Sequence, residues 1–207
     1  MKALIIANGS LPSRAIVTGL LRGAEFVVCA DGGANHARRL GIRPGIILGD
    51  LDSITPSTSR HFHRVPLLRI DDQESTDLEK ALNFCIERRF SHADIVGGTG
   101  DRIDHSTGTL GCFKRFGKKI TIRLIDEAGI IRLVGVSLEL NLRRGDPVSL
   151  IPLDRCLGVT TTHLKYPLAN EILELGVREG TSNVSTASNV LIRCRKGILL
   201  CMTFHRR

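Results

Sequence analysis

Acidic residues stand directly after several short apolar runs of the sequence, where buried strands would end. The runs are residues 26–30, 46–48 and 94–96, the last extended by a glycine-rich turn, and the acids that follow are Asp31, Asp50, Asp52, Asp101 and Asp104. In an open parallel sheet the carboxyl ends of the strands share one edge, and ligands bind in the crevice there. We therefore expect these carboxylates to converge. Asp77, in the first turn of a predicted helix, is expected to join them.

Such a group of acids needs a compensating cation. Side chains two residues apart, as in Asp50 and Asp52, can point the same way at roughly 6–7 Å. At an effective dielectric constant of about 20, two such charges repel by roughly 2.5 kcal/mol. Mg²⁺ is the expected cation because it takes oxygen ligands and joins carboxylates to substrate phosphates. The glycine-rich turn 97–100 and Arg102 offer donors to a phosphate, so the sequence predicts a metal and nucleotide site.

Each element of this prediction also has a purely structural explanation. Asp-Gly and Gly-Gly after a strand commonly turn the chain, Asp50 can cap a helix, and Asp77 can complement a helix dipole. None of these explanations accounts for the convergence of the acids on one edge of the sheet. The glycines fit neither the Walker pattern nor Gly-x-Gly-x-x-Gly. The pair His61 and His63 lacks partners at metal-site spacing and favours a solvated loop.

The elements that must position these residues alternate in type through the first half of the chain. Strands are expected at residues 3–7, 26–30, 46–48, 94–96 and 120–125, and helices at 12–21, 34–40, 76–89 and 105–116. This rhythm is typical of β-α units around a buried parallel sheet. Thr76 and Glu79 have the spacing of a capping box, which makes the third helix the firmest prediction.

The second half of the chain has a different pattern. Short β-rich runs recur at residues 136–142, 147–153, 158–164, 190–193 and 198–204, with turn residues between them and no long helical period. This favours a small antiparallel sandwich or barrel. We therefore expect two domains, 1–126 and 127–207, the first binding nucleotide and metal.

Composition narrows the class of protein. With 207 residues, of which 42% are hydrophobic and 24% charged, the chain is typical of a soluble globular protein. Its apolar runs are far shorter than the roughly 20 residues of a membrane-spanning helix. The N-terminus resembles no secretory signal, so a cytoplasmic location is expected. Six cysteines without any Cys-x-x-Cys pair favour reduced, buried thiols.

The net charge of +8 comes almost entirely from the second half of the chain. A basic balance suits nucleic acid, but it suits a polyphosphate ligand equally well. A single Tyr and no Trp leave few stacking platforms for a single strand, which disfavours nucleic acid as a partner.

Eight short motifs, in order along nearly the whole chain, resemble those of thiamine pyrophosphokinases. They are ADGGAN (30–35), GDLDS (49–53), STDLEKAL (75–82), GGTGDRIDH (97–105), SLIPL (149–153), GVTT (158–161), LKYPL (164–168) and TSN (181–183). The resemblance implies a Rossmann-like α/β domain followed by an antiparallel β-sandwich that binds thiamine. It also implies a homodimer with active sites shared between subunits.

The resemblance further implies the reaction, in which ATP and thiamine give thiamine diphosphate and AMP. The family's catalytic acids map onto Asp50, Asp52, Asp77 and Asp104, the first three as ligands of Mg²⁺. Residues implied in nucleotide, phosphate or thiamine contacts are Asp31, Asn35, Gln73, Thr76, Arg102, Ser182 and Asn183. Two positions depart from the family pattern: Val184 stands where some members have an aromatic residue, and His163 where Gly is common.

Two other functions remain open from the residues alone. The same acidic edge suits another Mg²⁺-dependent phosphoryl or nucleotidyl transferase, which differs in its acceptor and products. A basic RNA-binding protein predicts instead an affinity that falls steeply with salt and needs no metal.

Overall fold

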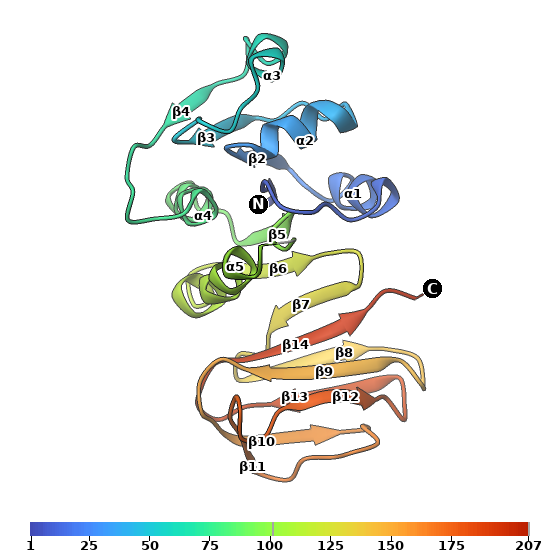
Figure 1. Cartoon of the computed structure of the whole chain (residues 1–207). Helices are drawn as coiled ribbons and strands as arrows, with labels where there is room; N and C mark the ends of the chain where they lie inside the picture. Colours follow the sequence, from blue (N-terminus) through green and yellow to red (C-terminus); the bar gives the residue numbers. More distant parts are fainter. Residues whose placement is uncertain (101, 207) are drawn as a thin grey trace. The chain divides into compact units, whose positions relative to one another are not determined.

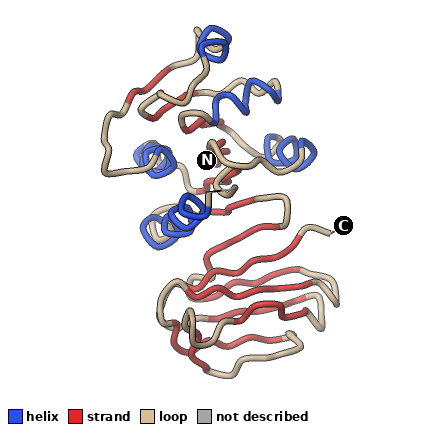
Figure 2. Tube along the Cα trace, in the orientation of Figure 1, coloured by secondary structure: helices blue, strands red, loops and turns tan. Residues whose placement is uncertain are grey.

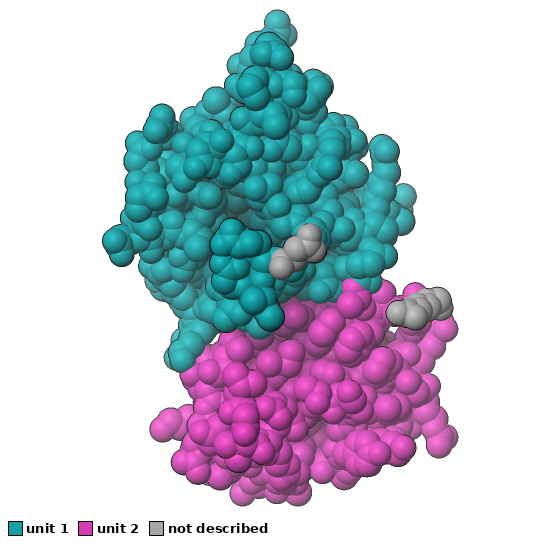
Figure 3. All heavy atoms as spheres, viewed as in Figure 1, with its two compact units in different colours: residues 1–127 teal, residues 128–207 magenta. Residues whose placement is uncertain are grey.

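The computed structural model describes residues 1–100 and 102–206, so the predicted acid Asp101 lies outside the described residues. The chain forms two compact units, Met1–Glu127 and Ala128–Arg207, coloured separately in Figure 3. We call them unit 1 and unit 2. The division falls one residue later than the boundary expected from the sequence.

Unit 1 is a parallel α/β sheet with helices on both faces (Figure 1). Its six strands run in the order β6-β5-β1-β2-β3-β4, and every neighbouring pair is parallel. The elements in chain order are β1 (Lys2–Ile6), α1 (Arg14–Leu21), β2 (Phe26–Ala30), α2 (Gly33–Leu40), β3 (Ile46–Gly49), α3 (Pro56–His61), β4 (Leu67–Arg69), α4 (Asp77–Glu87), β5 (His92–Val96), α5 (Ile103–Phe116) and β6 (Thr121–Ile125).

The strand order places a topological switch point beside β1. The chain moves outward from β1 through β2, β3 and β4, and then returns to the other side of β1 as β5. The central strands are buried on both faces, which explains their continuous apolar runs. At such a switch point the loops after adjacent strands diverge and leave a crevice. The fold therefore provides the expected ligand-binding edge.

The sequence predicted the central elements of unit 1 but missed two at its margin. α4 begins with the predicted capping box, in which Thr76 and Glu79 exchange hydrogen bonds with each other's backbone. Neither α3 nor β4 was expected. β4 has three residues, all exposed, at the edge of the sheet, so it lacks the buried apolar run that marks an interior strand. α3 has six residues and one buried side chain.

Unit 2 is antiparallel, and every helix of the described residues lies in unit 1 (Figure 2). Its strands are β7 (Gly129–Leu133), β8 (Ser137–Asn141), β9 (Pro147–Pro152), β10 (Cys156–Thr162), β11 (Glu171–Leu173), β12 (Gly180–Val184), β13 (Asn189–Arg193) and β14 (Leu199–Phe204). They pair in the orders β12-β9-β14-β7 and β11-β10-β13-β8. Side chains from both sets share one hydrophobic cluster, so the unit is a β-sandwich, as expected. Strands β7, β11 and β12 were not predicted.

The cysteine prediction is confirmed. All six cysteines are free and buried. Burial raises the pKa of each thiol, to about 12 at Cys85, Cys112 and Cys201, so the thiols stay protonated at neutral pH. Among the described residues no helix has the length and apolar character that crossing a membrane requires.

Candidate active site

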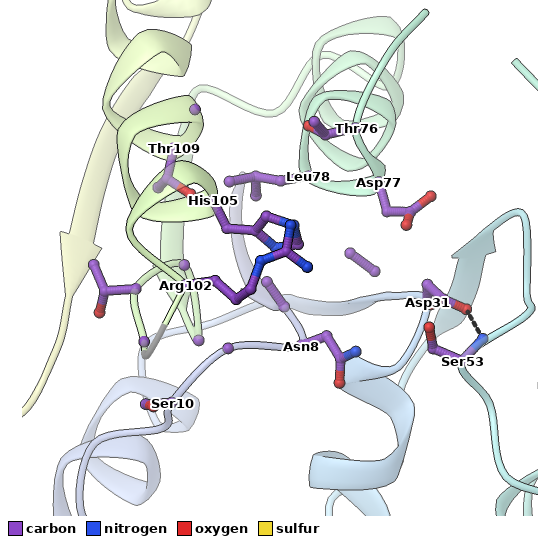
Figure 4. Close-up of a pocket in the computed structure, with 18 of the residues that line it drawn as sticks. Asn8, Ser10, Asp31, Ser53, Thr76, Asp77, Leu78, Arg102, His105 and Thr109 are labelled. Carbon is purple, nitrogen blue, oxygen red and sulfur yellow. Dashed lines mark hydrogen bonds between the residues drawn. The ribbon is translucent and has the colours of Figure 1, made fainter. Parts of the chain in front are cut away.

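A cavity of about 760 Å³ opens at the switch point of unit 1 (Figure 4). Its walls are the segments that follow β1, β2 and β5 and the first turns of α4 and α5. Lining residues that the sequence predicted are Asp31, Thr76, Asp77, Arg102 and Asp104, together with the glycine-rich turn 97–100. These residues lie far apart in the sequence and meet because the strand ends share one edge.

Two glycines allow the backbone and the acids to approach closely. At Gly33 a Cβ atom would lie 2.0 Å from the carbonyl oxygen of Ile6, so only glycine lets α2 start this near to β1. Gly49 has a φ of +141°, and a Cβ there would lie 2.9 Å from Oδ1 of Asp77 and 3.0 Å from Cβ of Asp31. A side chain at Gly49 would therefore push Asp31 and Asp77 apart.

Three carboxylates form what we call the acid cluster: Asp31, Asp50 and Asp77. Each offers an oxygen, and these oxygens all lie within 4.8 Å of one another. At an effective dielectric constant of about 20, two charges at this distance repel by roughly 3–4 kcal/mol. Burial, and secondarily the charge of Asp77, raise the pKa of Asp31, which is only 3% exposed. The cluster is therefore short of positive charge.

Backbone conformation contributes to this arrangement. Asp31 adopts a φ of +43° and Leu51 a φ of +67°, both in the left-handed region that side-chain-bearing residues rarely occupy. The backbone N–H of Ser53 donates to Oδ1 of Asp31 at 3.3 Å. Strained residues of this kind persist where the surrounding structure fixes them, which is common at functional sites.

The donor set of the acid cluster fits Mg²⁺. Carboxylate oxygens are the hard ligands that Mg²⁺ prefers, and one or two of them with phosphate oxygens and water complete its usual shell. The cluster contains no nitrogen or sulfur ligand that would favour zinc or copper. Two of the three predicted metal ligands, Asp50 and Asp77, belong to it.

Asp77 reaches the cluster because of how α4 begins. It is the first residue of the helix, directly after the cap residue Thr76, so its carboxylate also faces the positive end of the helix dipole. Its Oδ1 accepts a hydrogen bond from Nζ of Lys80 at 3.0 Å. Lys80 is only 5% exposed, which is rare for a lysine.

Arg102 and Asp104 pair with each other at the start of α5. Nε and Nη2 of Arg102 donate to the two oxygens of Asp104 at 3.0 and 2.5 Å. This bidentate contact holds the pKa of Asp104 well below its usual range. Both side chains are more than half exposed, so the guanidinium can exchange this partner for a phosphate at little cost. His105 lines the cavity beside them.

Three predicted residues lie outside the acid cluster and the cavity lining. Asp52 is exposed and accepts a hydrogen bond from Oγ of Ser53 at 2.9 Å. Asn35 donates to the carbonyl oxygen of Ser53 and accepts from Thr55, so its side chain fastens the segment after β3 to α2. Gln73 is exposed on the segment between β4 and α4.

The predicted residues of unit 2 lie on β12. Asn183 is 5% exposed, and its amide exchanges hydrogen bonds with the backbone of Tyr166 at 3.0 and 2.7 Å. Ser182 is exposed with a φ of +58°. His163 also lies in the left-handed region, with a φ of +56°. This conformation explains why glycine suits position 163.

Several cavity residues were not singled out from the sequence. Asn8 and Ser10 follow β1, Ser53 follows β3, His36 is on α2 and Thr109 is on α5. The signal for Asn8 was available, since Asn8-Gly9 ends the first predicted strand. Ser53 ends the motif GDLDS (49–53) but was given no role, and Ser10, His36 and Thr109 have side chains that are common in loops and helices and carried no distinguishing pattern.

Comparison with known proteins identifies the family. The family model described as "Thiamin pyrophosphokinase, catalytic domain" matches residues 17–125, and "Thiamin pyrophosphokinase, vitamin B1 binding domain" matches residues 136–199. Thiamine pyrophosphokinase of Bacillus subtilis is 30% identical over 204 residues, covering 95% of each chain. Thiamine pyrophosphokinase 1 of rice, Oryza sativa subsp. japonica, is 29% identical and covers 92% of this chain and 82% of its own.

Solved structures agree on the fold. The crystal structure of the Bacillus subtilis thiamine pyrophosphokinase superposes with a TM-score of 0.88 at 27% identity, covering all of both chains. The Candida albicans thiamin pyrophosphokinase, at 18% identity, has a TM-score of 0.87 and supports the fold alone. The two family models match the two units in turn, and the Bacillus subtilis relative matches nearly the whole chain. The chain therefore belongs to the thiamine pyrophosphokinase family.

Proposed function

We propose that this chain is a thiamine diphosphokinase, which transfers the diphosphoryl group of ATP to the primary hydroxyl of thiamine and releases AMP. The observation that carries the proposal is the acid cluster, of which Asp31 and Asp77 line the unit 1 cavity, in a chain that matches both domains of the family. Membership of this family makes the chain a transferase that uses ATP and thiamine as small-molecule substrates.

The residues of unit 1 bind and orient the phosphates. Phosphoryl transfer depends mainly on positioning and on charge, so the protein needs no strong nucleophile. Asp31, Asp50 and Asp77 have the oxygens to hold Mg²⁺. Bound there, Mg²⁺ offsets the negative charge of the transferred group and of the leaving AMP. Arg102 and residues 97–100 line the same cavity, and their guanidinium and backbone N–H groups are the proposed phosphate donors.

Asp77 and Asp104 are the two candidates for accepting the proton of the thiamine hydroxyl, because both carboxylates line the cavity. Asp52 stays a predicted catalytic residue and Mg²⁺ ligand, and Gln73 stays a predicted contact of phosphate or thiamine. Asp52 is two residues from Asp50, and Gln73 is four residues from Asp77.

Unit 2 is the proposed binding unit for thiamine. Its family model is the vitamin B1 binding domain. Tyr166 exposes 61% of its surface, and Asn183 holds its backbone next to Ser182. Thiamine carries a cationic thiazolium ring, which an aromatic face attracts. With Val184 in place of an aromatic residue, Tyr166 is the proposed ring partner, and Ser182 a polar contact.

The test is product analysis with purified protein, ATP, Mg²⁺ and thiamine. We expect AMP and thiamine diphosphate in equal amounts, no AMP without thiamine, and no product after removal of the metal with EDTA. ADP in place of AMP would indicate a simple kinase on the same scaffold. Metal-independent RNA binding that falls steeply with salt, without thiamine-dependent AMP, would favour the RNA-binding alternative.

Two further properties belong to this proposal. We propose a homodimer with shared active sites, which sedimentation velocity measures directly through the mass of the particle. We also propose a cytoplasmic location, which fractionation of the source cells tests.

A further inference from the structure

Lys80 is a buried lysine whose charge is directed at the acid cluster. It belongs to the buried face of α4, among Leu78, Ala81 and Leu82. Its side chain is 4% exposed, and Nζ lies 3.0 Å from Oδ1 of Asp77. A lysine is rarely buried to this extent without a charged partner, since desolvating an ammonium is costly. Asp77 is that partner, and it links Lys80 to the acid cluster of which Asp77 is a member.

The other cations near the cavity are exposed and engaged elsewhere. Arg102 pairs with Asp104, and Arg69 pairs with Asp71 at 2.6 Å, with the Arg69 side chain 69% exposed. Asp50 makes a minor contribution to the raised pKa of Arg69, behind the contact with Asp71. Solvent screens that interaction, whereas the Lys80 ammonium is shielded from water. Among the described residues, Lys80 is the buried cation that contacts the cluster.

We propose that Lys80 is the built-in counter-cation of the metal site. Its ammonium offsets part of the negative charge of the acid cluster in the free enzyme. The same charge weakens the binding of a free divalent cation. The metal is then held firmly only when the phosphates of ATP supply further negative charge. This inference rests on the proposed function, because it assigns Mg²⁺ to the acid cluster.

The geometry of α4 supports a fixed position for this charge. Lys80 stands three residues after Asp77, a spacing at which helical side chains meet. The capping box fixes the backbone of the first helical turn, which holds Asp77 and Lys80 at this spacing. An ammonium repels a divalent ion that shares its carboxylate, and this repulsion is strong where water is excluded. Lys80 therefore stabilises the empty site at the expense of metal affinity.

The experiment compares wild type with Lys80→Met and Lys80→Arg. Binding of Mn²⁺, as a probe for the divalent site, is measured by electron paramagnetic resonance without nucleotide. Thermal unfolding is measured in EDTA and in excess Mg²⁺. For Lys80→Met we expect Mn²⁺ affinity to rise on the order of tenfold, Tm in EDTA to fall by several degrees, and the rise of Tm on adding Mg²⁺ to exceed that of wild type. Lys80→Arg keeps the charge and should retain the wild-type affinity.

Lys2→Met is the matched control. Nζ of Lys2 lies 2.7 Å from Oδ2 of buried Asp94, a lysine–aspartate pair outside the acid cluster in which the acid rather than the lysine is the buried partner. We expect Lys2→Met to lower Tm equally in EDTA and in Mg²⁺ and to leave Mn²⁺ affinity unchanged. If Lys80→Met does not fold in EDTA, Lys80→Gln, which keeps a polar end, is measured in its place.

The outcomes separate the inference from the function on which it rests. Weaker or unchanged Mn²⁺ binding in Lys80→Met, or an equal loss of Tm with and without Mg²⁺, would overturn the counter-cation role while leaving the metal site standing. If wild type binds no Mn²⁺ even in the presence of a non-hydrolysable ATP analogue, the metal site itself is excluded, and the inference with it.

Discussion

Asp94 is a buried carboxylate of unit 1 and the acid cluster a partly buried group of three, and their charges are balanced in opposite ways. Asp94, on β5, is 1% exposed and has two cations. Arg123 donates to both of its oxygens at 2.6 and 2.5 Å, and Lys2 lies 2.7 Å away. The acid cluster has three carboxylates and one buried cation, Lys80. Asp94 has its counter-charges within the protein, whereas the acid cluster has an excess of negative charge that the proposed Mg²⁺ would offset.

This difference in counter-charge distinguishes Asp94 from the acids of the proposed metal site. Burial alone would raise the pKa of both Asp31 and Asp94. At Asp94 the hydrogen bonds from Arg123 and Lys2 outweigh burial and lower the pKa. At Asp31 burial dominates, and the charge of Asp77 adds to it, so the pKa rises. A raised pKa next to other carboxylates supports the proposal that this site binds a cation.

Asp50→Asn should produce the largest effect on activity. It removes one charge from the acid cluster, so we expect turnover to fall roughly 100- to 1,000-fold. The free energy of unfolding should stay constant or rise, because repulsion within the cluster is relieved. AMP formation and urea unfolding measure the two quantities. Asp52→Asn is the matched variant, and we expect a smaller loss because Asp52 lies outside the cluster. Equal losses would place Asp52 among the metal ligands.

Asp94→Asn should produce the opposite profile. The substitution leaves Arg123 and Lys2 without their anion, so we expect the free energy of unfolding to fall by about 3 kcal/mol. Turnover per folded molecule should stay near that of wild type, because Asp94 does not line the cavity. Urea unfolding and the thiamine-dependent AMP assay check both halves. A large loss of turnover in folded Asp94→Asn would end the distinction between the two carboxylate sites.

The pH dependence of stability sharpens the same comparison. The pKa of Asp94 is lower in the folded state than the value of about 4 for an unfolded chain. Its stabilisation is therefore complete above that unfolded pKa and is lost as the pH falls through the folded pKa. We expect the stability gap between wild type and Asp94→Asn to be constant at neutral pH and to shrink below about pH 4. A gap that stays constant down to pH 3 would contradict the ion-pair account.

Tyr166→Ala tests the acceptor side while both carboxylate sites stay intact. Loss of an aromatic face toward a cationic ring costs about 1–2 kcal/mol, so KM for thiamine should rise roughly five- to thirtyfold. KM for ATP should not change. Tyr166→Phe keeps the ring and should behave as wild type. An unchanged KM for thiamine in Tyr166→Ala would exclude Tyr166 as the ring partner.

Thr76→Ala should lower the free energy of unfolding by less than Asp94→Asn does. Thr76 accepts from the backbone N–H of Glu79 at 3.3 Å and caps the helix that carries Asp77. Loss of such a cap costs about 1 kcal/mol of unfolding free energy. Thr76→Ser keeps the hydroxyl and should restore it. Urea unfolding of the three proteins, with AMP assays alongside, shows whether the acid cluster depends on this cap.

The sequence predicted the parts of the molecule that local pattern determines. Apolar runs predicted the buried strands, and the capping box predicted the start of α4. The principle that parallel strands end at one edge predicted that Asp31, Asp50 and Asp77 lie close together. Strands β7, β11 and β12 escaped prediction. β11 has three residues, and β12 contains the polar run Thr181, Ser182 and Asn183, so neither shows clear apolar alternation.

The spacing of residues in the sequence could not predict which acids belong to the acid cluster. Asp52 shares a motif with Asp50, but Leu51 between them takes a left-handed conformation, and Asp31 approaches from another strand. Asn35 lies in a family motif, and its side chain is used by Ser53 and Thr55. Lys80 sits among apolar residues at helical period, which signals burial but not its partner. Such contacts depend on dihedral angles and tertiary distances.

The six buried thiols make the protein suited to site-specific chemical labelling. Maleimides react with exposed thiolates, and every native cysteine is both enclosed and held protonated. A single cysteine introduced in place of Ile103, which is 82% exposed and adjacent to Arg102, would be the one cysteine that a maleimide dye labels. Its fluorescence would then report on nucleotide arriving at the cavity without any native cysteine having to be removed.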